Sequence, residues 1–155
     1  VFVVVCACVI SRRRPSLRNE LLRLIDLGHQ IQVVDENIYR WKVKIPGPPT
    51  SLYFPGVYTV NIEIPCVYPN QAPKVQFETR ILHPNIKNGD FCVNLLTLWN
   101  ASNNMTDVLQ AISHVLLEPN YESPYNTEAA FAYHHNQVAY ENSVRRMVQL
   151  YAVGG

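Results

Sequence analysis

The chain has 155 residues, a length that suits one domain with a substantial core. Apolar residues make up 48% and charged residues 16% of the sequence, which excludes a disordered chain and predicts a folded globular protein. The formal net charge of +1 gives no overall attraction for nucleic acid, so no nucleic-acid partner is expected.

Four cysteines are present: Cys6, Cys8, Cys66 and Cys92. Beyond the pair Cys6-x-Cys8 they lack metal-ligand spacing, and no histidine pattern completes a zinc site, so no metal is expected. Free thiols in a reducing compartment, the cytoplasm or the nucleus, are the simplest interpretation.

The N-terminal run Val1–Ile10 is wholly apolar, but spanning a bilayer takes about 20 residues. Its charges, Arg12, Arg13 and Arg14, follow the run rather than precede it, contrary to a secretory signal. We therefore expect no membrane partner. Residues 1–15 are interpreted as an extension: a cloning remnant, a misassigned gene start or an extra strand.

A helix is predicted over residues 15–28, because apolar residues recur every three to four positions and Gly28 provides a stop. These residues should form one apolar face that packs against the rest of the protein: Leu17, Leu21, Leu24 and Ile25. The middle of the chain then alternates with period two, which predicts strands with one covered face. The predicted strands lie at 31–34, 39–45, 58–64 and 75–78.

The segment 83–92 is the most informative part of the chain. Its proline favours an extended backbone, so the first three residues, His83 to Asn85, should form a rigid elbow. The pair Asn88-Gly89 tolerates positive φ and predicts a tight turn. The turn should hold Cys92 on an apolar wall near the side-chain amide of Asn85.

A thiol and an amide at such a site suit acyl transfer, in which a sulfur attacks a carbonyl and charge develops on its oxygen. Losing one oxyanion donor typically costs about 2.7–4 kcal/mol of barrier. An ordinary thiol is already partly ionised near neutral pH, so no dedicated base is needed. Cys92 is thus the candidate nucleophile and Asn85 the candidate donor. The alternative is that Cys92 is a small buried hydrophobe and Asn85 a turn former.

Three helices are expected after the cysteine. The first spans 105–116 with Asn104 as its N-cap, and the second begins at Asn126. The third runs over 138–151, followed by a flexible tail at 153–155. Its expected inward residues are Val144, Met147, Val148 and Tyr151. The predicted architecture is α+β, with an N-terminal helix, a four-stranded antiparallel sheet and C-terminal helices.

Several motifs, in one order along the chain, resemble the catalytic core of ubiquitin-conjugating enzymes. The resemblance covers residues 16–152, which we interpret as one domain. Its elements are Gly47-Pro48, Ser51–Gly56, Tyr68-Pro69, Ala72–Val75, His83-Pro84-Asn85, Cys92, Trp99 and Glu118–Pro124.

The resemblance implies a carrier that holds a ubiquitin-like modifier as a thioester on Cys92 and transfers it to substrate lysines. Asn85 then steadies the oxyanion or the loop, and His83 ties down the elbow. Ser123 occupies a gate position that is often Asp in the family. No cofactor is implied, because the activating enzyme spends the ATP. A papain-like hydrolase, by contrast, would use His83 as its base.

The resemblance also implies protein partners. The first helix of the family docks onto the activating enzyme, which makes its arginines a candidate surface: Arg12, Arg13, Arg14 and Arg18. Such a charge run is otherwise simply a solvated face. A ligase of RING or related type would meet the segments 45–54 and 99–102.

The chain departs from the family pattern at several points. The spacing from Asn85 to Cys92 is one residue shorter than usual, Ser123 lacks a charge, and no proline follows Trp99. Segments 117–130 and 141–147 are most similar to the neddylation branch, so a Nedd/Rub-type modifier is favoured. A general ubiquitin-conjugating enzyme is the alternative. An inactive ubiquitin-binding module of the same fold stays open.

Overall fold

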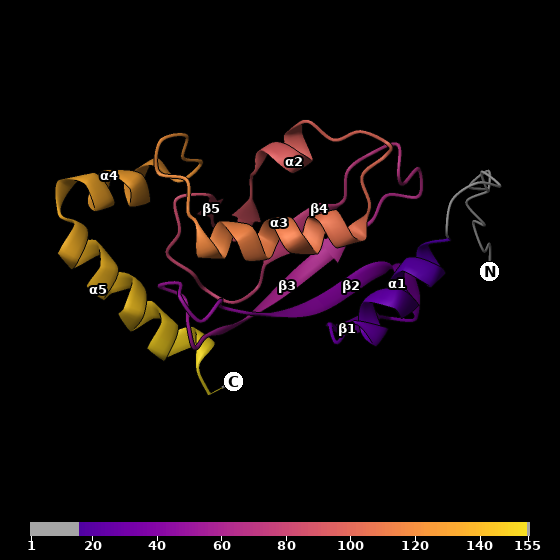
Figure 1. Ribbon diagram of the computed structural model, residues 1–155, viewed down its shortest axis with the longest axis horizontal. Helices are drawn as coiled ribbons and strands as arrows, with labels where there is room; N and C mark the ends of the chain where they lie inside the picture. Colours follow the sequence, from indigo (N-terminus) through magenta and orange to yellow (C-terminus); the bar gives the residue numbers. More distant parts are fainter. Residues whose placement is uncertain (1–15, 155) are drawn as a thin grey trace.

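A computed structural model describes residues 16–154 (Figure 1). The helices are α1 (Leu17–Asp26), α2 (Asn94–Thr97), α3 (Met105–Leu117), α4 (Thr127–His135), α5 (Gln137–Met147) and the π-helical turn η1 (Val148–Ala152). The strands are β1 (Gln30–Val34), β2 (Asn37–Pro46), β3 (Val57–Glu63), β4 (Lys74–Phe77), β5 (Ile86–Lys87) and β6 (Asp90–Phe91). Along residues 16–154, one helix precedes the six strands and the other helices follow them, which confirms the α+β prediction.

The strands form one antiparallel sheet in the order β1-β2-β3-β4-β6-β5. The first four strands are those expected from period-two alternation. The predicted number of four is wrong, because β5 and β6 add two short strands at one edge. Strands of two residues are too short to show an alternating pattern, and these two carry the chain to Cys92.

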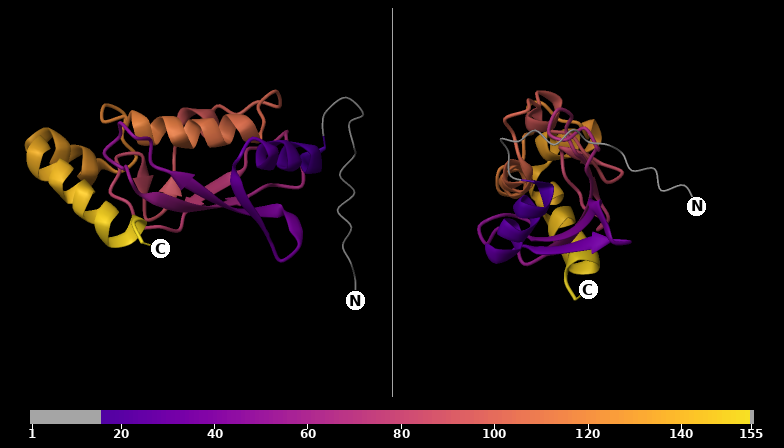
Figure 2. Two further views of the ribbon diagram at one scale, coloured as in Figure 1. Left: turned by 60° about the horizontal axis from the view of Figure 1, so that its bottom comes forward. Right: turned by 90° about the vertical axis from the view of Figure 1, so that its right-hand side faces the viewer.

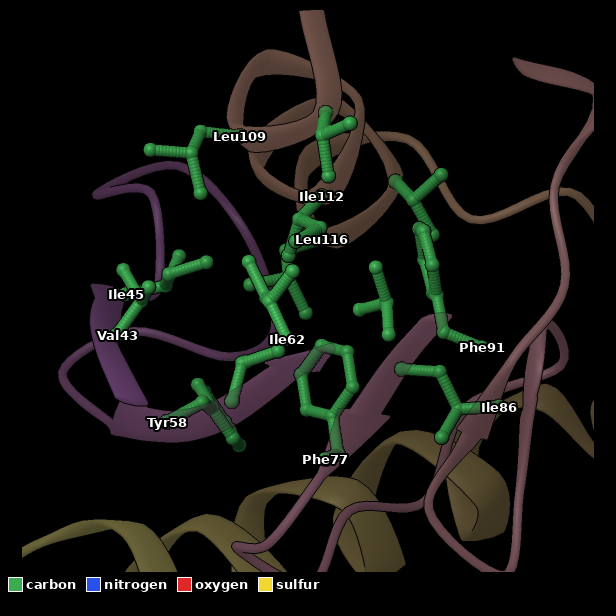
Figure 3. Close-up of a cluster of buried hydrophobic side chains, with 14 of the residues drawn as sticks. Val43, Ile45, Tyr58, Ile62, Phe77, Ile86, Phe91, Leu109, Ile112 and Leu116 are labelled. Carbon is green, nitrogen blue, oxygen red and sulfur yellow. The ribbon is translucent and has the colours of Figure 1, made fainter. Parts of the chain in front are cut away.

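Helix α3 lies along one face of the sheet, with α1 at one end of the molecule and α4 and α5 at the other (Figure 2). Figure 3 shows strand side chains meeting the apolar face of α3. Each fully buried side chain of this kind contributes about 1.5–3 kcal/mol. The buried residues include Val43, Ile45, Tyr58, Ile62, Phe77, Leu109, Ile112 and Leu116.

The predicted helix signals have clear structural counterparts. The Asn104 side chain accepts from the Asp107 N–H at 3.1 Å, while the Asp107 carboxylate accepts from the Asn104 N–H at 3.0 Å. This reciprocal pair fixes the first turn of α3. Helix α1 stops before Gly28, whose φ of +96° suits a residue without a side chain.

Two expectations about helix faces are wrong. Ile25 lies near the end of α1 and is 43% exposed, although Leu21 and Leu24 are buried. Tyr151 is 44% exposed rather than inward, and Ala152 is buried in its place. At Tyr151 the cause is the π turn η1, in which the Val153 N–H donates to the Val148 carbonyl five residues back, so the 3.6-residue period is lost.

Glu20 links α1 to the rest of the fold. Its carboxylate accepts from the Tyr68 hydroxyl at 2.8 Å and from the Met105 N–H at 3.1 Å, at the first turn of α3. A carboxylate at a helix N-terminus is favourable because it meets unpaired N–H groups. Across residues 16–154, none of the helices has the length and apolar character needed to cross a membrane.

Candidate active site

His83 is fully buried, and both of its ring nitrogens are hydrogen-bonded. Nδ1 accepts from the Asn85 N–H at 2.9 Å, so Nε2 carries the proton and donates to the Val115 carbonyl at 2.9 Å. Burial lowers the pKa of His83 to about 4, despite the bond to Val115. The Tyr53 ring packs on the imidazole, with centroids 5.2 Å apart. The lone pair of Nδ1 already accepts a hydrogen bond and Nε2 is protonated, so this buried imidazole has no free lone pair to act as the base of a papain-like hydrolase.

Asn85 joins the elbow to two other segments. Its backbone carbonyl accepts from the Cys92 N–H at 3.2 Å. Its side-chain oxygen accepts from the Asn120 N–H at 2.9 Å, and its amide nitrogen donates to the Asn120 carbonyl at 3.2 Å. Within residues 16–154 this is the one hydrogen bond of that nitrogen, which leaves its second N–H available. The amide therefore holds the 118–126 segment against the elbow.

The turn between β5 and β6 has the predicted chemistry. Asn88 and Gly89 have φ values of +51° and +85°, and the residues on either side of them, Lys87 and Asp90, are paired. Positive φ at both positions defines the type I′ turn, which suits the twist of a hairpin. The turn also packs closely on β4, because a Cβ on Gly89 would lie 2.6 Å from the Phe77 carbonyl oxygen.

Cys92 follows β6 and is half-buried. It lines a groove of about 430 Å³ together with residues of β4, β6 and α2 and with Tyr125. Cys92 is thus not fully buried, despite the shorter spacing between Asn85 and Cys92. Cys92 therefore lies between the buried elbow, to which its N–H donates, and an open groove that it lines.

The gate position Ser123 is exposed, and its backbone is fixed by Asn120. The Asn120 side-chain oxygen accepts from the N–H groups of Glu122 and Ser123, each at 3.0 Å. Sequence reasoning missed Asn120, because its contacts to Asn85 use backbone atoms that any residue carries. Only its own turn chemistry, typical of Asn, could have drawn attention to it.

The structure brings together His83, Asn85 and Cys92, and it connects Ser123 to them through Asn120. Of the arginines expected at a partner surface, Arg18 is exposed on α1, whereas Arg12, Arg13 and Arg14 lie outside the described residues. In the part of the chain that the structure describes, no group of three His, Cys, Asp or Glu side chains could hold a metal.

Comparison with known proteins identifies related chains. The profile of the family described as "Ubiquitin-conjugating enzyme" matches residues 16–148. "Probable ubiquitin-conjugating enzyme E2 L460" of Acanthamoeba polyphaga mimivirus is 42% identical over 119 residues, or 75% of each chain. "Ubiquitin conjugating enzyme E2 B" of Dictyostelium discoideum is 34% identical over 122 residues, or 77% of this chain and 82% of that one. The solved E2 domain of a Toxoplasma gondii ubiquitin conjugating enzyme has 31% identity and a TM-score of 0.83, covering 88% of this chain and 96% of that one.

Proposed function

The chain belongs to the ubiquitin-conjugating enzyme family, and on this premise we propose that Cys92 accepts ubiquitin from an activating enzyme and passes it to a substrate lysine. The observation that carries the proposal is the position of Cys92, half-buried in an open groove beside the elbow 83–85. The other cysteine within residues 16–154, Cys66, is exposed in the segment that follows β3.

Ubiquitin is proposed as the modifier because both relatives named above are described as ubiquitin-conjugating enzymes. The Nedd/Rub-type modifier, favoured from segments 117–130 and 141–147, has no support from these relatives. Ubiquitin therefore replaces it as the preferred modifier, and the Nedd-type modifier becomes the second arm of the test.

The proposed cycle has two acyl transfers. The Cys92 sulfur first attacks the thioester carbonyl on the activating enzyme, whose own cysteine leaves as a thiolate. A substrate amine then attacks the Cys92 thioester, the C–N bond replaces the C–S bond, and Cys92 leaves. We assign Asn85 the part of positioning the 118–126 segment and of offering its second N–H to the developing oxyanion.

The proposed partners follow from the family. The activating enzyme would dock on α1, where Arg18 is exposed, and a ligase of the RING or a related type would meet the segments 45–54 and 99–102. Substrate proteins supply the lysines. A reducing compartment, the cytoplasm or the nucleus, is proposed because the cycle requires a free Cys92 thiol.

The test is a non-reducing gel of the protein charged with ubiquitin or with the Nedd-type modifier, each with its own activating enzyme and ATP. We expect a reducer-sensitive adduct with ubiquitin. It should vanish in Cys92→Ala, become reducer-resistant in Cys92→Ser and persist in the control Cys66→Ala. An adduct with the Nedd-type modifier alone would overturn the choice of ubiquitin. No adduct with either modifier would favour the inactive binding module.

A further inference from the structure

The groove beside Cys92 contains two charged side chains that the proposed cycle has not used. Lys74 from β4 and Asp90 from β6 both line it. Among residues 16–154, neither side chain forms an ion pair, since the salt bridges there involve other residues. The groove is therefore lined by one cation and one anion that have no ion-pair partner among the described residues.

Asp90, the first residue of β6, and Cys92, which directly follows β6, are two residues apart and both line the groove. Successive side chains of a strand point to opposite faces, so residues two apart share a face, with Cα atoms about 6.5–7 Å apart. Phe91, between them, is 7% exposed and belongs to the core. Continuing the alternation of β6 by one residue gives the Asp90 and Cys92 side chains the same face, beside the groove that both residues line.

The Asp90 side chain is also held in place. Asp90 pairs with Gln76 across the sheet, and the Gln76 amide donates to one carboxylate oxygen of Asp90 at 3.4 Å. The tight turn at Asn88-Gly89 fixes the other end of the strand. Within residues 16–154 no hydrogen bond to the second carboxylate oxygen is seen, so this oxygen can meet a group that enters the groove.

We propose that Asp90 is the acidic residue that receives the nitrogen of the acceptor lysine when this nitrogen attacks the Cys92 thioester. The inference rests on the proposed function. The nitrogen becomes positively charged as the C–N bond forms, and a carboxylate beside it stabilises this charge in the transition state. Ser123 cannot do so, because it is neutral.

The other groups around the groove agree with this assignment. Tyr125 is 43% exposed in the same groove and offers an aromatic face for the apolar stem of a lysine. Lys74 would repel a developing ammonium, whereas Asp90 would attract it. Glu122, the acid nearest to Ser123 in sequence, lies 3.9 Å from His134 on α4.

The step balances without a further reactant. The neutral fraction of the lysine amine attacks the thioester carbonyl, the C–N bond forms and the C–S bond breaks. Cys92 leaves as a thiolate, and the proton lost by the nitrogen passes to water. Asp90 does not need to change its protonation state, and it acts through its charge.

The test is single-turnover discharge of the ubiquitin thioester, formed on Cys92 and separated from the activating enzyme. Free lysine is one acceptor and the thiolate of 2-mercaptoethanol is the other. Asp90→Asn keeps the oxygen that Gln76 bonds and removes the charge. We expect it to slow discharge to lysine about tenfold, the size of one partly exposed charge pair. Release to the thiolate should be unchanged or faster, because this attacker gains no positive charge.

Asp90→Glu should retain most of the lysine rate, and Glu122→Gln, the matched control, should leave it unchanged. Asp90→Ser repeats the test if Asp90→Asn does not fold. Equal slowing with both acceptors would indicate a structural defect and overturn the proposal, as would slowing in Glu122→Gln with a normal Asp90→Asn. If the parent protein forms no thioester on Cys92, the proposed function fails first, and this inference falls with it.

Discussion

The two sides of Cys92 are built in opposite ways. On one side His83 and Asn85 are almost fully buried, at 0% and 3% exposed, and their polar atoms are bonded to fixed backbone groups. On the other side Asp90 is half-buried, Tyr125 is exposed, and both line an open groove. Changes on the elbow side should therefore cost stability, whereas changes on the groove side should alter rates while the fold persists.

The largest effect is expected at His83. In His83→Ala, the Asn85 N–H and the Val115 carbonyl lose their partners inside the protein, at about 1–3 kcal/mol each. We expect a loss of about 3 kcal/mol or more in the free energy of unfolding, measured by urea denaturation. His114→Ala, at an exposed histidine on α3, is the control and should change it by less than about 0.5 kcal/mol. If both variants change the free energy of unfolding by only a small amount, the elbow side does not contribute more to stability than the groove side.

Acid should weaken the elbow side in the same way. The folded-state pKa of His83, about 4, lies below the ordinary value of 6.5, so the unfolded chain binds a proton that the folded chain does not. The contribution of His83 to the free energy of unfolding is fully present above pH 6.5. It is lost as the pH falls toward 4, and the loss amounts to about 3 kcal/mol. In urea unfolding between pH 4 and 7.5, the free energy of unfolding should depend less steeply on pH in His83→Phe than in the parent protein. Parallel curves for the two proteins would contradict the assignment.

Asn120 lies between the two sides, and its replacement should have an intermediate effect. Asn120→Ala keeps the backbone groups that bind Asn85 but removes the oxygen that fixes Glu122 and Ser123. We expect a loss of about 1 kcal/mol in thermal or urea unfolding. Asn120→Asp retains an acceptor and should recover most of this loss. A loss as large as that of His83→Ala would place Asn120 within the buried elbow.

The smallest effect is expected on the groove side. Tyr125→Leu should change the free energy of unfolding by less than about 0.5 kcal/mol, because the ring is exposed. Differential scanning calorimetry can measure this change directly. Tyr140→Leu, at a buried tyrosine of α5, is the matched control and should destabilise the protein clearly. Equal melting temperatures for the two variants would show that burial does not separate these positions.

The sequence was informative wherever a feature depends on neighbouring residues. The cap at Asn104 and the turn at Asn88-Gly89 come from local chemistry, and the structure confirms both. Contacts between distant segments could not be predicted in this way. The pairing of Gln76 with Asp90 depends on sheet register, and the contact of Asn85 with Asn120 crosses 35 residues.

In the β5–β6 hairpin, the structural effect of a change in length depends on where the change occurs. A type I′ turn already has the short two-residue loop, so an insertion at Asn88-Gly89 can be taken up as a longer loop while the strand pairs on either side are kept. Deleting one residue between Asp90 and Cys92 would instead reverse the parity of the strand, turning the sulfur toward the core and an apolar side chain toward water. Insertions should therefore be tolerated at the tip of this hairpin, whereas insertions or deletions of an odd number of residues should not be tolerated between Asp90 and Cys92.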